Sequence, residues 1–144
     1  MFKRILFILA LCISTNIQAE QAKTFGSYKI HYSAFTADIL TAEVAKAYNI
    51  KRSRSTVLIN ITLMKDTGEA LPLAQNAEVQ ITGRNLLGQV KSITVQEILE
   101  QDAIYYLGEL SVSNQETITF NVTVAPKQSK KELQFSFKEK FFIQ

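Results

Sequence analysis

His31 is the only histidine in the sequence, and histidine is the side chain that most often serves as a general base. Hydrolysis by a serine or cysteine nucleophile would need such a base beside the nucleophile, together with an acid that orients it. No serine stands between glycines as in a nucleophile elbow, and His31 falls on the polar face of a predicted strand. We therefore predict that the protein is not an enzyme, and we keep His31 as a candidate contact residue.

Metal-ligating side chains are too few and too scattered to predict a metal centre. Transition metals favour clustered histidine, thiolate or carboxylate ligands. After residue 19 the sequence offers one histidine, one methionine and no cysteine. Asp66, Glu69 and Asp102 lack the dense spacing of a calcium-binding loop. We predict neither a metal nor a cofactor.

The strongest local charge feature is the basic cluster Lys51, Arg52 and Arg54. Guanidinium groups at such a corner could bind a carboxylate, a phosphate or an anionic lipid head group. The alternative is a solvated loop in which Arg52 pairs with a nearby acid such as Glu43 or Glu100. We favour the second interpretation, because exposed charges normally need no special explanation.

Two pairs of adjacent aromatic residues predict rings that point away from the core. Tyr105 and Tyr106 are neighbours in one predicted strand, and Phe141 and Phe142 are neighbours near the C-terminus. Successive residues of a strand point to opposite faces, so one member of each pair should face outward. An outward ring could contact a partner, or Tyr48 could cover it; both alternatives stay open.

The N-terminus has the pattern of a secretory signal peptide. Lys3 and Arg4 precede an apolar run over residues 5–13, and the chain then turns polar and reaches the small residue Ala19. We predict cleavage after Ala19, because the apolar run is too short for a membrane-spanning helix. Cys12 would leave with the leader, and lipidation is disfavoured because Leu11, rather than a small residue, precedes it.

Removal of residues 1–19 would leave 144 − 19 = 125 residues, enough for one domain over residues 20–144 with a core that needs no disulfides. The formal net charge of +3 includes Lys3 and Arg4, so the processed chain would carry about 3 − 2 = +1. A nucleic-acid-binding surface would need a marked basic excess. We therefore predict a periplasmic or secreted protein that does not bind nucleic acid.

Beyond the leader, hydrophobic residues alternate with polar ones, as in half-buried strands. Turn sequences separate these runs at residues 65–68, 85–88, 113–115 and 126–131, and residues 90–112 predict two strands that turn at Gln101 and Asp102. About seven or eight strands fit. The clearest apolar faces are Tyr28, Ile30, Tyr32 and Ala34; Val57, Ile59, Ile61 and Leu63; Val79 and Ile81; Phe120, Val122 and Val124; and Leu133, Phe135 and Phe137.

One segment breaks this alternation. Residues 41–48 are rich in helix formers, Thr41 can cap the start, and Asn49 can end the helix in a left-handed conformation. Leu40, Val44 and Tyr48 recur every four residues and should face the sheets. We therefore predict an all-β, immunoglobulin-like antiparallel β-sandwich with one short helix between the first two strands.

Several blocks of the sequence resemble the bacterial exported-protein family DUF4426, a domain of unknown function. The chain departs from the family pattern at Ala42, where proline would be expected. The resemblance implies a periplasmic protein of Gram-negative bacteria with an immunoglobulin-like sandwich, and it implies no activity. The blocks that carry it are residues 31–35, 40–48, 52–53 and 58–61, Gly83, residues 85–88, Glu100 and residues 103–106.

Three functional hypotheses follow. The first is a non-enzymatic binding or adaptor module that contacts another envelope protein through an edge strand or the helix-side surface. The second is a carrier of a small anionic ligand or lipid at the Lys51 to Arg54 corner, and the third is an enzyme that acts on an envelope polymer. The candidate contact residues are His31, Tyr48, Lys51, Arg52, Arg54, Tyr105 and Tyr106.

Overall fold

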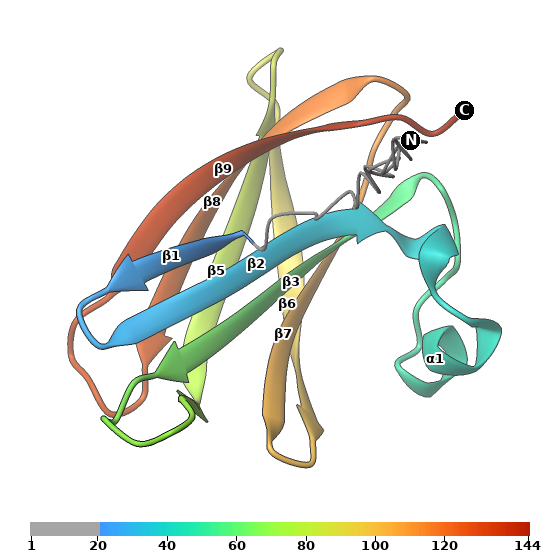
Figure 1. Cartoon of the computed structure of the whole chain (residues 1–144). Coiled ribbons are helices and arrows are strands. Elements are labelled where there is room, and N and C mark those ends of the chain that lie inside the picture. The colour runs from blue at the N-terminus through green and yellow to red at the C-terminus, as the bar shows by residue number, and fades with distance from the viewer. Residues whose placement is uncertain (1–20) are drawn as a thin grey trace, which may run out of the picture.

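The computed structural model describes residues 21–144, which form nine strands, one α-helix and one 3₁₀ helix (Figure 1). The predicted leader, its cleavage site and Cys12 lie outside the described residues. No helix within 21–144 is long and apolar enough to cross a membrane. In chain order the elements are β1 (Ala22–Phe25), β2 (Tyr28–Thr36), η1 (Ala37–Ile39), α1 (Ala42–Ala47), β3 (Thr56–Lys65), β4 (Leu73–Ala74), β5 (Ala77–Asn85), β6 (Val90–Glu100), β7 (Ala103–Ser111), β8 (Glu116–Pro126) and β9 (Leu133–Phe141).

The strands form one continuous antiparallel sheet in the order β1-β2-β3-β7-β6-β5-β8-β9, with β4 paired to β3. The long strand β6 belongs to both halves of this sheet. Its residues 90–93 pair with β5, and its residues 94–100 pair with β7. The sheet therefore bends around β6 into a nearly closed barrel (Figure 1).

The immunoglobulin-like prediction is therefore wrong, although the all-β, antiparallel prediction is confirmed. Two glycines lie in the strands that flank β6. A Cβ atom on Gly108 of β7 would lie 2.6 Å from Cγ2 of Ile93, and one on Gly83 of β5 would lie 3.1 Å from Cγ2 of Ile118. The absence of a side chain on Gly108 lets Ile93 of β6 pack directly against β7 where β6 changes partner, while Gly83 leaves room for Ile118 of β8.

The inward side chains fill the barrel with one apolar core. Alternate residues of β3 and β8, among them Ile59, Ile61 and Phe120, are fully buried. At the seam between the two ends of the sheet, the Tyr32 ring of β2 packs on Phe135 and Phe137 of β9, with ring centroids 5.0 and 4.7 Å apart. Among the described residues, β2 and β9 share no ladder of backbone hydrogen bonds. Aromatic packing therefore holds the seam together.

The predicted strands are confirmed, and two short strands are additional. The turn between β6 and β7 falls at Gln101 and Asp102 as predicted, with Gln101 at φ 50°. Strand β1 was not predicted, although Gly26 at φ +59° followed by Ser27 forms a two-residue connection to β2. The sequence therefore contains a hairpin signal for β1, although β1 was not predicted from it.

The short helix is confirmed between the first two predicted strands. The Thr41 side chain accepts a hydrogen bond from Val44 N at 3.2 Å, and Asn49 adopts φ 55° after the last turn. Ala45 is the residue that α1 buries, whereas Val44 is 39% exposed and lines an open hollow between the helix and the sheet. The helix covers a second apolar cluster, formed by Ala37, Ala45, Ile50 and Leu58 on the outer side of the barrel.

Candidate functional site

An apolar pocket of about 510 Å³ lies between α1 and the outer face of the sheet. Its walls come from the end of β2, the helix, and the outward residues of β3, β6 and β7. Most of the lining is hydrophobic, with three polar side chains. The lining residues are Phe35, Leu40, Glu43, Val44, Ala47, Tyr48, Ile50, Leu58, Asn60, Ile98, Glu100, Tyr105 and Leu107.

Strand register produces the apolar floor. Leu58 pairs with Phe35, and Asn60 pairs with Leu107, so three hydrophobic side chains stand together on a face where the alternation predicts polar ones. Leu58 is 1% exposed because the helix and Ile50 cover it. The helix thus leaves part of an apolar outer surface open instead of covering all of it.

The polar groups of this pocket include one amide and two carboxylates. The Oδ1 atom of Asn60 is buried and makes no hydrogen bond in the structure. Glu43 and Glu100 line the pocket, and neither forms an ion pair with another described residue. A buried acceptor without a donor is unfavourable in the free protein, and a ligand donor would satisfy it if the Asn60 side chain turned toward the pocket.

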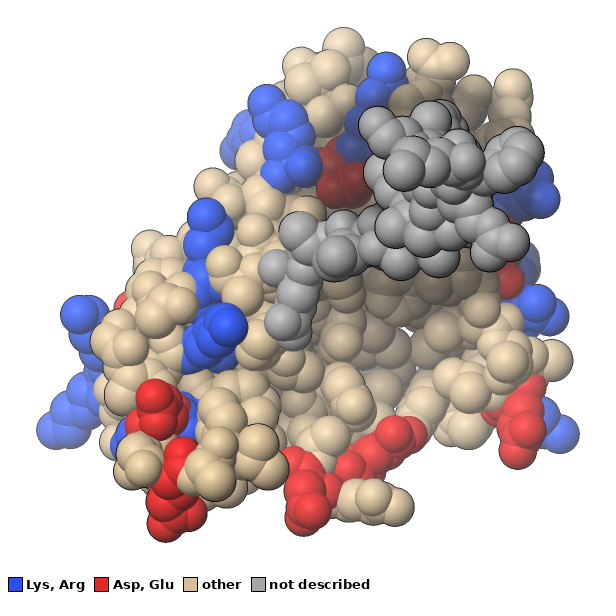
Figure 2. All heavy atoms as spheres, viewed as in Figure 1, with Lys and Arg blue, Asp and Glu red and all other residues tan. Residues whose placement is uncertain are grey.

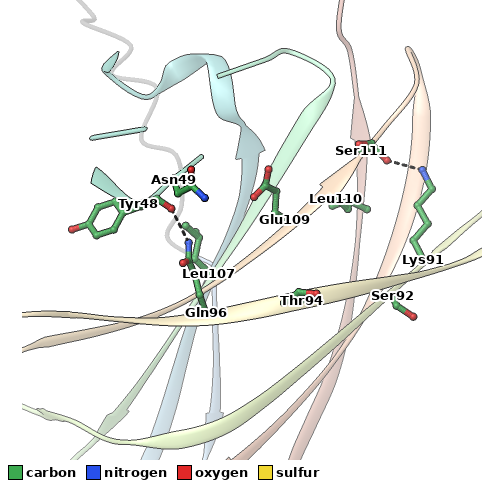
Figure 3. Close-up of a pocket in the computed structure, with 10 residues that line it drawn as sticks. All are labelled: Tyr48, Asn49, Lys91, Ser92, Thr94, Gln96, Leu107, Glu109, Leu110 and Ser111. Carbon is green, nitrogen blue, oxygen red and sulfur yellow. Dashed lines mark hydrogen bonds between the residues drawn. The ribbon is translucent and has the colours of Figure 1, made fainter. Parts of the chain in front are cut away.

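A polar cleft of about 750 Å³ adjoins the apolar pocket (Figure 3). Tyr48 and Leu107 line both hollows and stand between them. In Figure 3 the end of α1 faces β6, where Gln96 Nε2 donates a hydrogen bond to the Tyr48 carbonyl oxygen at 3.4 Å. Glu109 and Thr94 line the same cleft. We call the apolar pocket and the polar cleft together the helix-side groove.

Of the predicted contact residues, Tyr48 and Tyr105 meet in this groove, since both line the apolar pocket. The predicted split of the aromatic pairs is confirmed: Tyr105 points outward, whereas Tyr106 is 3% exposed and part of the core. At the C-terminus, Phe141 is buried and Phe142 is 66% exposed. Tyr106 is therefore a structural residue.

The Tyr106 hydroxyl joins three strands. It donates to Glu97 Oε2 of β6 at 2.9 Å and accepts a hydrogen bond from the backbone N–H of Ala77, the first residue of β5, at 2.8 Å. Burial raises the pKa of Tyr106 to about 12; the Ala77 N–H opposes this rise, and the Glu97 carboxylate adds to it.

We expect Tyr106→Phe to destabilise the protein by about 1–2 kcal/mol at neutral pH, because the buried Ala77 N–H loses its acceptor. Since the folded pKa is the higher one, the hydroxyl stabilises the wild type fully below pH 10, and this contribution is lost as pH rises through about 12. Absorbance titration of the tyrosines should show a late ionisation near pH 12 that Tyr106→Phe lacks. A variant with an unchanged titration would contradict the assignment.

The basic corner contains its own carboxylate. Arg54 Nε lies 3.5 Å from Asp38 Oδ2, and Arg52 Nη2 donates to the Asp38 backbone oxygen at 3.5 Å. The predicted pairing of Arg52 with Glu43 or Glu100 is not found: the ion pair at this corner joins Arg54 to Asp38, and Arg52 reaches only a backbone oxygen. Lys51 is exposed beside them. An incoming anion would have to compete with the Asp38 carboxylate.

His31 lies on the outer face of β2 opposite Thr62 and does not line the helix-side groove. Within residues 21–144, no three side chains of His, Cys, Asp or Glu gather closely enough to hold a metal ion. The structure therefore brings together Tyr48 and Tyr105 and separates them from His31 and from Arg52 and Arg54.

Sequence reasoning missed Leu58, Asn60, Ile98 and Leu107 as parts of a site. Leu58 and Leu107 carried a detectable signal, because each is a leucine at the position of a strand where the outward, polar residue is expected. Asn60 carried none, since its burial depends on a helix that packs over the strand.

Comparison with known proteins gives a family and a fold. A DUF4426 family protein from Pseudomonas aeruginosa is 30% identical, covers 89% of this chain and 98% of its own, and superposes with a TM-score of 0.75. FetP from uropathogenic Escherichia coli, recombinantly expressed in the periplasm, is 9% identical, with 85% and 93% of the chains covered and a TM-score of 0.60.

A copper-bound variant of FetP is 10% identical, with 85% and 95% covered and the same TM-score of 0.60. At such identities the FetP likeness concerns the fold alone. A search of the curated proteins finds no match. The model of the DUF4426 domain of unknown function matches residues 22–144, and the chain therefore belongs to the DUF4426 family.

Proposed function

We propose that the protein is a non-catalytic binding module of the periplasm whose helix-side groove receives a segment of another envelope protein. The single observation that carries the proposal is the open apolar pocket beside α1, with the unsatisfied Asn60 Oδ1 in its wall. A pocket with an apolar floor and a few convergent polar groups is the usual form of a binding site.

The chemistry of the pocket defines the expected segment. Leu58 and Leu107 offer a floor for one apolar side chain, and Asn60 Oδ1, once its side chain turns toward the pocket, can accept a hydrogen bond from a backbone N–H. Glu43 and Glu100 line the same pocket and favour a lysine or arginine next to that apolar residue. An anionic ligand would meet these two carboxylates, so the groove argues for a protein segment over an anion carrier.

The periplasmic location is part of the proposal. It rests on the leader pattern of residues 1–19 and on the fold shared with FetP, which has been expressed in the periplasm. Intact mass spectrometry of the exported protein should find a chain that begins at Glu20.

We expect Ala47→Arg to abolish partner binding with no loss of stability. Ala47 is exposed and lines the pocket, so a long side chain there would fill the pocket without disturbing the core. A photo-crosslinking residue in place of Val44 should capture one envelope protein reproducibly in living cells. The crosslinked peptide should carry an apolar residue next to lysine or arginine, and the capture should disappear in Ala47→Arg.

The matched control is Ala42→Arg, which places the same side chain at the exposed start of the same helix, outside the pocket. With the captured partner purified, Glu43→Gln with Glu100→Gln should weaken its binding by about tenfold, whereas Glu78→Gln on β5 should not. Capture that Ala42→Arg and Ala47→Arg reduce equally, or no reproducible capture at Val44, would refute the groove as the binding site.

A further inference from the structure

Two leucines are exposed at the tip of the β5–β6 hairpin, far along the chain from the helix. Leu86 is 76% exposed and Leu87 is 85% exposed. A single exposed leucine is ordinary, but two adjacent leucines on a protruding turn expose a concentrated apolar area. Neither residue lines the helix-side groove.

The turn that carries these leucines is built from hydrogen bonds of one side chain. Asn85 Oδ1 accepts from the backbone N–H groups of Leu87 and Gln89 at 3.1 and 2.9 Å, while Asn85 Nδ2 donates to Gln89 Oε1 at 2.7 Å. The same nitrogen donates to Glu116 Oε1 at 3.2 Å. Both ends of the amide are therefore occupied, and the leucines are held in an outward position instead of folding back.

Basic side chains stand on the outer face of the sheet beside this tip. The register aligns Arg84 with Thr119 and Thr119 with Lys138, and it pairs Thr117 with Lys140. The Lys140 ammonium lies 5.3 Å from the centre of the exposed Phe142 ring. We define the tip surface as Arg84, Leu86, Leu87, Val90, Lys138, Lys140 and Phe142, all of which are exposed.

The nearby acids are turned inward or paired. Glu116 forms an ion pair with Lys91 at 3.0 Å and is 14% exposed. Glu139 alternates with Lys138 and Lys140 and so points to the inner face, where burial raises its pKa. On the face drawn in Figure 2, most acidic side chains lie at the lower end, away from the upper end where Figure 1 places the β5–β6 tip and the end of β9.

We propose that the tip surface attaches the protein peripherally to an anionic lipid surface, with Leu86 and Leu87 inserted among the acyl chains and Arg84, Lys138 and Lys140 at the head groups. A convex tip with apolar ends and a basic collar fits a bilayer, which supplies both an apolar interior and negative charge. The proposal is independent of the groove, because the tip surface and the groove share no residue.

The test uses the exported protein, with its N-terminus established by mass spectrometry, and sedimentation with vesicles. We expect it to bind vesicles made of equal parts phosphatidylglycerol and phosphatidylcholine. We expect no binding to vesicles made of phosphatidylcholine alone. Leu86→Ser with Leu87→Ser should weaken this binding at least about tenfold. Arg84→Gln with Lys138→Gln and Lys140→Gln should weaken it more, because each cation near an anionic surface strengthens binding about fivefold.

Leu71→Ser with Leu73→Ser is the matched apolar control, since these leucines are 75% and 50% exposed at and just before β4. Lys23→Gln with Lys29→Gln and Lys46→Gln is the matched charge control, because it also removes three exposed cations. Equal binding to both kinds of vesicle, no binding to either, or an equal loss in the control and tip variants would overturn the proposal. Binding of the tip surface to an acidic protein, without binding to vesicles, would also overturn the proposal. This surface would then be a protein interface.

Discussion

Phe120→Ala is expected to lower the free energy of unfolding by about 3–5 kcal/mol, the usual effect of emptying a fully buried aromatic site. Phe120 is 0% exposed. Its ring stacks on Phe137 at 4.9 Å between centroids and meets the edge of Phe141 at 6.2 Å. Because Phe137 also contacts Tyr32 across the seam, the cavity would loosen the closure of the barrel as well as the core.

Urea unfolding followed by circular dichroism measures this effect, and the shift of the midpoint gives its size. Phe142→Ala is the matched control, because Phe142 is 66% exposed and its truncation should change the free energy of unfolding by no more than about 0.5 kcal/mol. Similar losses for the two variants would show that the barrel core does not depend on Phe120.

Glu116→Gln should be the second most costly change, with a loss of about 2–3 kcal/mol. The Glu116 carboxylate receives the Ser113 N–H at 2.7 Å, the Lys91 ammonium at 3.0 Å and the Asn85 amide at 3.2 Å. The amide nitrogen of glutamine would have to face one of these donors. The loss should appear in urea unfolding at neutral pH, and Glu69→Gln at an exposed position is the control.

This effect should depend on pH in a defined direction. Burial opposes ionisation of Glu116, but the hydrogen bonds from Ser113, Lys91 and Asn85 outweigh it and lower the pKa of the carboxyl from its ordinary value of 4.5. The stabilisation is therefore complete above pH 4.5 and is lost as pH falls through the lower folded pKa. The stability difference between wild type and Glu116→Gln should shrink in acid; a difference that grows there would contradict the assignment.

Much of the secondary structure could be predicted from local residues. Alternation located β3 and β8, the Gln101 turn divided β6 from β7, and Thr41 marked the start of α1. These predictions succeeded because the alternation of side chains along a strand and the capping of a helix are local properties of the backbone. Strand β1 was missed even though Gly26 and Ser27 are a local hairpin signal.

The candidate site could be predicted only in part. The adjacent pair Tyr105 and Tyr106 predicted one outward ring, which Tyr48 could cover, and both Tyr48 and Tyr105 line the groove. Lys51, Arg52 and Arg54 were chosen for their charge, but the carboxylate that engages this corner belongs to Asp38, which the linear sequence did not single out. Pairings between residues that approach only after folding leave no spacing pattern to detect.

The sequence by itself determined an all-strand, antiparallel chain with one capped helix, because each of those features follows from side-chain period and local backbone preference. Only the tertiary structure decided that β6 is shared between the two halves of one barrel, with Ile93 packed against Gly108 where β6 changes partner. Packing also decided that Leu58 and Asn60 line the hollow beside α1. Such contacts join residues that are distant in the chain, so their geometry exists only once the barrel has closed.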